Sequence, residues 1–130
     1  MSYYFNKIVS TKSFDLAIEQ VKEELKKEGF GVLTEIDVKA TLKKKIDVDF
    51  KKYQILGACH PTSAYKALTA EDKIGVFLPC NVIVEEHSNG DIEVSAVDPI
   101  ASMMAVKNDG LGETAMEIHE KLKTVIENLQ

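Results

Sequence analysis

Residues 76–99 read VFLPCNVIVEEHSNGDIEVSAVDP, and this stretch decides the fold. Residues 76–84 are apolar on both faces, which predicts a central, covered strand. The polar residues 87–91 follow, and their Asn89-Gly90 pair favours a tight hairpin because both residues tolerate positive φ. Residues 92–97 predict the returning strand, so at least part of the sheet is antiparallel.

Upstream of this hairpin, residues 4–9, 30–36 and 53–59 have the composition or alternation of three further strands. Residues 14–27 carry apolar side chains at three- and four-residue steps, which predicts a helix with one buried face. Ser13 is expected to cap this helix, and Gly29 to supply the left-handed residue that ends it.

Shorter helices are expected after three residues that suit a helix start, namely Asp37, Pro61 and Pro99. No linker or repeat divides the chain, so residues 1–130 are expected to form one domain. Strands grouped apart from the long helices predict an α+β fold. We expect a two-layer sandwich with a mostly antiparallel sheet, helices on one face and a long C-terminal helix.

The last helix carries a narrow apolar seam with steps of four and three residues: Leu111, Ala115, Ile118, Leu122, Val125 and Leu129. Such a seam either docks on the protein's own sheet or forms the interface of a dimer. The spacing alone leaves both alternatives open.

Composition and charge indicate which classes of partner and which compartment suit the protein. The 130 residues carry a net charge of −5 and include no arginine, which disfavours a nucleic-acid partner. The lysines that cluster between Lys39 and Lys52 are interpreted as a solvated helix face. No apolar run approaches the roughly 20 residues of a membrane span, and two cysteines without an export signal indicate a reducing, cytoplasmic setting.

One constellation remains as a candidate site, because the common nucleotide-binding, hydrolase and CxxC motifs are absent. The third strand ends in Cys59-His60-Pro61, and the fourth contains Pro79-Cys80. If these strands are neighbours, the two cysteines approach each other. Pro79 within a strand would imply a bulge or an edge, and bulges often lie beside binding sites.

The segments GACHPTSAYKAL (57–68), IGVFLPCNVIV (74–84) and VDP (97–99) resemble the domain-of-unknown-function 302 family. The resemblance covers nearly the whole chain and implies a compact two-layer α+β domain, similar to TATA-binding-protein-like folds and often dimeric. It implies no established activity. The family usually has Asn-Pro after the first cysteine, whereas this chain has His60-Pro61, so no role for His60 follows from the family.

Three interpretations of the cysteine pair stay open. Cys59, His60 and Cys80 are suitable ligands for zinc or another transition metal, with Asp98, His119 or a partner residue as a fourth ligand. Alternatively, Cys59 acts as a nucleophile or forms a redox couple with Cys80. The simplest interpretation is that both cysteines are small, buried residues of the core.

From these alternatives we expect a binding protein rather than an enzyme. The expected ligand is a metal ion or a small thiol-reactive molecule at Cys59, His60 and Cys80, with Asp98 in support. A thiol redox protein and a homodimeric interaction module are the alternatives. Met103 and Met104 could line an adaptable pocket, although core packing explains them as well.

Overall fold

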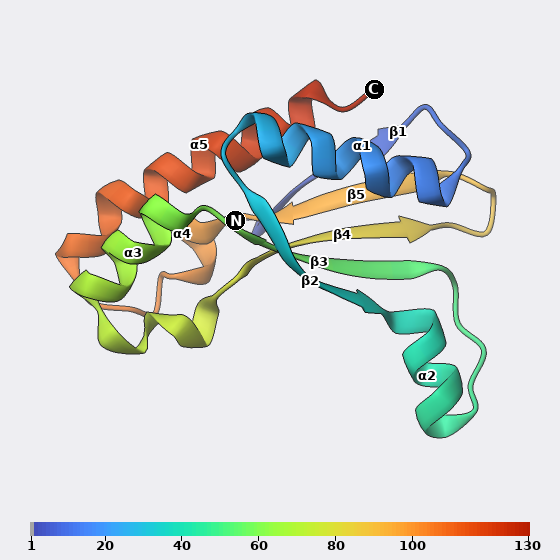
Figure 1. Cartoon of the computed structure of the whole chain (residues 1–130), viewed down its shortest axis with the longest axis horizontal. Helices are drawn as coiled ribbons and strands as arrows, with labels where there is room; N and C mark the ends of the chain where they lie inside the picture. Colours follow the sequence, from blue (N-terminus) through green and yellow to red (C-terminus); the bar gives the residue numbers. More distant parts are fainter. Residues whose placement is uncertain (1) are drawn as a thin grey trace.

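The computed structural model describes residues 2–130 and consists of a five-stranded sheet with helices on one face (Figure 1). Every pair of neighbouring strands is antiparallel, in the order β1-β5-β4-β3-β2. The strands are β1 (Tyr4–Val9), β2 (Gly31–Asp37), β3 (Tyr53–Cys59), β4 (Cys80–Glu86) and β5 (Ile92–Val97). The predicted α+β sandwich is therefore confirmed.

Two long helices, α1 (Phe14–Lys27) and α5 (Gly112–Asn128), lie across the same face of the sheet (Figure 1). Between them and the sheet lies the main core, to which β4 and β5 contribute Val82, Val84, Ile92 and Val94. Their neighbours along the strands alternate to the opposite face, as the period of a strand requires. That open face leaves apolar side chains such as Ile8 exposed.

The ends of α1 follow from its sequence. The Ser13 hydroxyl accepts a hydrogen bond from the Leu16 amide, which satisfies one of the free donors of the first turn. Gly29 follows the helix with φ +88°, a conformation that a side chain would strain. Both features match the predicted boundaries of the helix.

The shorter helices lie at the two ends of the sheet. At one end are α3 (Pro61–Ala70), the 3-10 helix η1 (Asp72–Phe77), α4 (Pro99–Ser102) and the 3-10 helix η2 (Asp109–Leu111) (Figure 1). At the other end α2 (Val38–Ile46) projects away from the body and buries none of its residues. Asp37 caps α2 by accepting from the Ala40 amide, as predicted.

The predicted start of the central strand is wrong. β4 begins at Cys80, because residues 72–77 form η1 instead, and an apolar run does not by itself distinguish a strand from a helix. Pro79 therefore precedes the strand, and its bond to Leu78 is cis. The expectation of a bulge or an edge at Pro79 within a strand is therefore wrong. The register shift in the sheet lies between Val32 and Thr34 of β2.

The hairpin between β4 and β5 is present, but its loop is longer than a two-residue turn. The His87 amide bonds to the Asp91 carbonyl, and the Gly90 amide bonds to the His87 carbonyl. Only Gly90 takes positive φ within this loop. The expectation that Asn89 would share that conformation is therefore wrong.

Most of the apolar seam packs in the core between α5 and the chain's own sheet, through Ile118, Leu122, Val125 and Leu129. Leu111 lies in η2 and packs with Ala67 and Ile74 instead. All six side chains of the seam are buried, and Leu122 and Val125 are fully enclosed. The alternative in which this seam forms a dimer interface is therefore wrong, because its side chains are already covered. Across residues 2–130, no helix combines the length and apolar character that crossing a bilayer requires.

Candidate functional site

A cavity of about 50 Å³ lies where β3 and β4 end against α3 and α5. Both cysteines line it, together with apolar side chains that include Phe30, Leu78 and Met103. The predicted neighbourhood of Cys59 and Cys80 arises because β3 and β4 are adjacent and Ala58 pairs with Cys80. Since about 10–15 Å³ is needed to hold one water, the cavity has room for a molecule of a few heavy atoms.

The two thiols differ in environment. Cys80 is buried, with 9% of its surface exposed, whereas Cys59 at the last position of β3 is half-buried. Burial, with a smaller contribution from Cys59, raises the pKa of the Cys80 thiol to about 11. Cys80 is therefore protonated at neutral pH, and Cys59 is the thiol that solvent reaches.

His60 lines the same cavity but is held by local structure. Its Nδ1 accepts a hydrogen bond from the Ser63 amide, so the imidazole caps α3. The ring packs edge-on against Phe30, and a Cβ added at Gly29 would lie 3.0 Å from Nε2. An Nδ1 that accepts this bond is not free to coordinate a metal, and Nε2 faces the end of α1.

Asp98 and His119 form a separate pair. Asp98 is buried, and its Oδ1 accepts from the Ile100 amide at 3.0 Å and lies 2.8 Å from His119 Nδ1. This pair joins the start of α4 to α5, and neither residue lines the cysteine cavity. The arrangement therefore gives Asp98 a capping role at α4.

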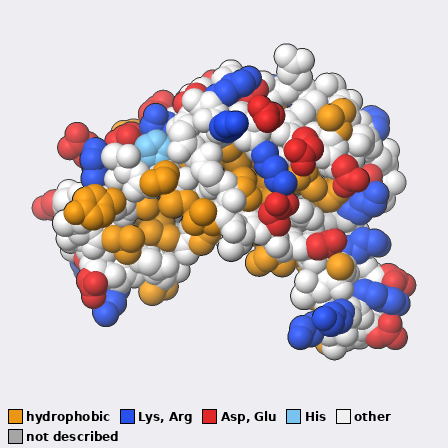
Figure 2. Space-filling view, in the orientation of Figure 1, with side chains coloured by type: hydrophobic (Ala, Val, Ile, Leu, Met, Phe, Trp, Pro, Cys, Tyr) orange, Lys and Arg blue, Asp and Glu red, His pale blue; other side chains and the backbone are white. Residues whose placement is uncertain are grey.

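The cavity separates two groups of buried side chains. On one side is the main core, and on the other is a satellite cluster of Ala67, Ile74 and Leu111. Exposed apolar side chains surround this end of the molecule, and Figure 2 shows them gathered over α3 and η1. They include Tyr65, Val76 and Met104. The cavity is thus an apolar site at the apolar end of the protein.

A family model for a domain of unknown function, DUF302, matches residues 6–129. The chain belongs to the DUF302 family. The crystal structure of an uncharacterized conserved DUF302 protein from Bacillus stearothermophilus is similar, with 30% sequence identity and a TM-score of 0.91 over 100% of both chains. No curated protein matches the chain.

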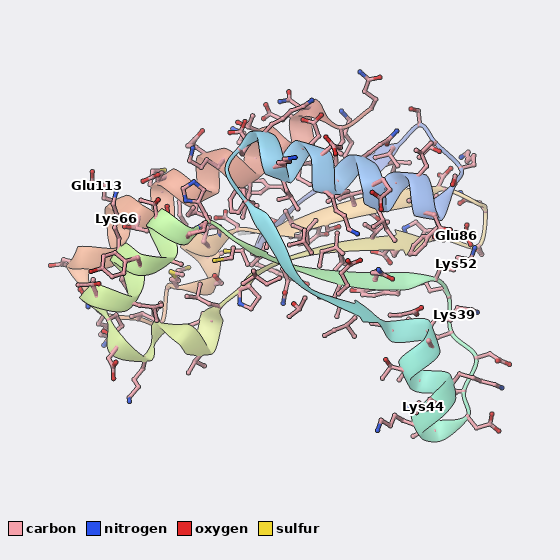
Figure 3. All side chains as sticks on the ribbon, viewed as in Figure 1. Lys39, Lys44, Lys52, Lys66, Glu86 and Glu113 are labelled. Carbon is pink, nitrogen blue, oxygen red and sulfur yellow. The ribbon has the colours of Figure 1, made fainter. Side chains whose placement is uncertain are left out.

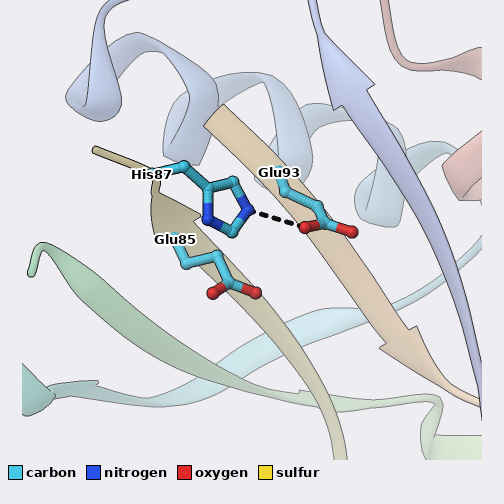
Figure 4. Close-up of side chains that lie close together, drawn as sticks. All are labelled: Glu85, His87 and Glu93. Atoms are coloured by element: carbon cyan, nitrogen blue, oxygen red, sulfur yellow. Dashed lines mark hydrogen bonds and ion pairs between the residues drawn. The ribbon is translucent and has the colours of Figure 1, made fainter. Parts of the chain in front are cut away.

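A second polar cluster of this DUF302 domain was not predicted. Among residues 2–130, one group of three His, Cys, Asp or Glu side chains has its ligand atoms within 4.8 Å of one another, namely Glu85, His87 and Glu93 (Figure 4). Cys59, His60 and Cys80 do not form such a group. Strand alternation offered a signal, because Glu85, His87 and Glu93 all fall on the face opposite the core.

Proposed function

We propose that this DUF302 domain binds a small, apolar, thiol-reactive molecule in the cavity beside Cys59 and Cys80. The observation that supports this proposal is the composition of the cavity wall, in which two free thiols are set among apolar side chains. Apolar walls select apolar ligands, and the few polar groups fix their orientation. Cys59 lines the cavity and is partly exposed, so it is the thiol that reacts with an electrophilic ligand.

The metal-binding form of this proposal has weaker support. A structural zinc site needs four ligands in a tetrahedron. His60 Nδ1 is engaged by Ser63, and Asp98 is engaged by His119 and the Ile100 amide. The two cysteines alone would leave a zinc or other transition-metal ion incompletely coordinated, so an organic ligand fits the cavity better.

The thiol-enzyme alternative has less support, because Cys80 is buried and the His60 Nδ1 that would assist Cys59 as a base already accepts from the Ser63 amide. Reactive cysteines have a lowered pKa, whereas burial raises the pKa of Cys80. We therefore propose binding rather than catalysis. Two free cysteines suit a reducing compartment, so a cytoplasmic location remains part of the proposal.

The test compares two electrophiles of similar size, methyl vinyl ketone, which is apolar, and acrylamide, which is polar. Each rate of Cys59 labelling, followed by mass spectrometry, is divided by the rate in the urea-unfolded chain. We expect the folded protein to favour methyl vinyl ketone by about tenfold, as 1.4 kcal/mol of selective binding would give. An equal ratio for the two reagents would contradict the proposal.

A matched pair of variants locates the effect. Ala64 lines the cavity, whereas Ala70 lies on the same helix and does not. Ala64→Leu should remove the preference for methyl vinyl ketone, and Ala70→Leu should keep it. Elemental analysis of the untagged protein addresses the metal form, because one transition metal per chain, lost in Cys59→Ser, would make a metal ion the ligand.

We also propose a homodimer in which α2 of one copy packs on its partner. Figure 1 shows α2 projecting from the body, and none of its residues is buried. Val38, Leu42 and Ile46 share one side of this helix because they are spaced four residues apart. A nine-residue helix is marginal in water without tertiary contacts. Its lysines, of which Figure 3 labels Lys39 and Lys44, complement the net negative charge of a second copy.

Sedimentation at micromolar concentration tests the dimer. The wild type should sediment as a dimer that weakens as salt rises. Ile46→Asp should give a monomer, while Lys44→Ala should weaken the association by a smaller factor, because it removes one of the complementary charges. A monomeric wild type at 100 mM salt would contradict this second proposal.

A further inference from the structure

The open face of the sheet holds a groove of about 440 Å³, remote from the cysteine cavity. Its floor includes Ile83 and Ser95, which are direct partners across β4 and β5. Three tyrosines contribute to its lining: Tyr3 just before β1, Tyr4 at the start of β1, and Tyr53 at the start of β3. The groove is thus built on paired strands and lined by aromatic side chains.

One end of the groove is acidic. Glu85 and Glu93 lie directly opposite each other on β4 and β5, a like-charge pairing that destabilises a sheet unless other groups compensate. Asn6 donates to Glu93 at 2.6 Å, and His87 Nε2 lies 2.8 Å from the same carboxylate (Figure 4). The Asn6 hydrogen bond, with a smaller contribution from His87, lowers the pKa of Glu93, so this carboxylate is ionised at neutral pH.

The acidic end already holds an ammonium group. Lys51 Nζ lies 2.6 Å from Glu85 Oε1 and 5.9 Å from the centre of the Tyr53 ring. A cation between a carboxylate and an aromatic face is the arrangement by which proteins bind alkylammonium ligands. Lys51 is exposed and its side chain is long, so a competing cation can displace it at modest cost.

Ser95 provides an independent indication of a ligand. Only 7% of its surface is exposed, it lines the groove, and its hydroxyl makes no hydrogen bond to any residue from 2 to 130. The Ser95 oxygen is not among the fully enclosed side-chain atoms that lack a partner, so it is open to the groove. A ligand hydroxyl or amine lying on the floor of the groove can therefore bond it.

We propose that this groove binds a small organic cation whose alkylammonium head replaces the Lys51 ammonium between Glu85 and Tyr53. The body of the ligand lies on Ile83, and a polar group of the ligand bonds the Ser95 hydroxyl. The site is distinct from the cysteine cavity, because it lies on the opposite face of the sheet and shares no lining residue with it.

The experiment titrates the full chain with choline and with 3,3-dimethyl-1-butanol, its uncharged analogue of the same shape. Backbone amide shifts of Ile83 and Ser95, measured by NMR, report where each probe binds. We expect choline to move these two amides and to bind about tenfold more tightly than the alcohol. Equal affinities, or no shift at either amide, would overturn the proposal.

Two matched pairs of variants sharpen the result. Lys51→Met removes the internal competitor and should raise choline affinity about threefold to tenfold. Lys52→Met removes the same charge from the next residue, which lies over Phe14 on the helix side, and should leave the affinity unchanged. Equal effects of the two variants would indicate a general charge effect and overturn the specific site.

Glu85→Gln and Glu86→Gln form the second pair. Glu86 follows Glu85 on β4 and alternates to the helix side, where Figure 3 shows it near Lys52. Glu85→Gln and Tyr53→Leu should each weaken choline binding at least fivefold, whereas Glu86→Gln should not.

A titration with zinc or manganese tests a metal ion as the ligand instead. If either ion binds through Glu85, His87 and Glu93 in the wild type and choline cannot compete, the ligand is a metal ion and the proposal is overturned.

Discussion

Ala58 and Cys80 are direct partners in the antiparallel ladder of β3 and β4. Their side chains share the helix-covered face, which is why the Cys80 thiol is buried, while Cys59 falls one position later at the end of the strand. Iodoacetamide should therefore label Cys59 alone in the native protein. Cys80 should react about a hundredfold more slowly, and rapid double labelling without denaturant would contradict this geometry.

The raised pKa of Cys80 makes stability depend on alkaline pH. The unfolded chain loses this proton near pH 9, whereas the folded chain keeps it to about pH 11. Between these values the unfolded state binds fewer protons, so the free energy of unfolding should fall as pH rises, by about 1–3 kcal/mol. Urea titrations at pH 8 and pH 10.5 measure this fall, and Cys80→Ala should lose the part of it that Cys80 contributes.

Gly57 is required by its neighbours on the open face. A Cβ at this position would lie 2.2 Å from Thr34 Oγ1 and 2.7 Å from Pro79 Cγ. Gly57→Ala should therefore destabilise the protein by about 2–3 kcal/mol, because overpacking displaces adjacent strands. Gly31→Ala is the control, since nothing lies within 4 Å of its added Cβ. Similar urea midpoints for the two variants would refute this account of Gly57.

The seam of α5 should carry a large share of the stability of the monomer. Leu122 is fully enclosed, whereas Met116 on the same helix is half exposed. Leu122→Ala should cost about 3–5 kcal/mol, and Met116→Ala less than about 1 kcal/mol. Urea unfolding should show this difference without dependence on protein concentration. If the loss of stability in Leu122→Ala depended on protein concentration, the seam would have to be a dimer interface after all.

Local sequence signals were sufficient for most of the fold. Alternation predicted β2 to within one residue at each end, and the polar turn at residues 87–91 placed β5 after it. Ser13, Asp37 and Pro61 marked helix starts, because capping and proline chemistry act within a few residues. The prediction that the central strand includes residues 76–79 was wrong, because an apolar run suits a strand and a buried 3-10 helix equally. The spacing of the seam residues did not show whether they pack on the chain's own sheet or on a second copy, because that depends on tertiary packing.

The candidate site was predictable only in part. The proximity of Cys59 and Cys80 followed from two strands expected to be neighbours. The capping role of His60 and the pairing of Asp98 with His119 depend on how α3 and α4 begin, and the sequence left those side chains available as ligands. The tyrosine-lined groove requires the register of four strands, which no single motif specifies.

The dependence of the Cys59 labelling rate on methyl vinyl ketone concentration tests the central claim most directly. A ligand that first occupies the cavity and then reacts gives a rate that saturates. We expect saturation in the wild type and a linear dependence in Ala64→Leu and in the unfolded chain. A strictly linear dependence in the folded wild type, with the slope of the unfolded chain, would show that Cys59 reacts from bulk solvent and would contradict a binding cavity.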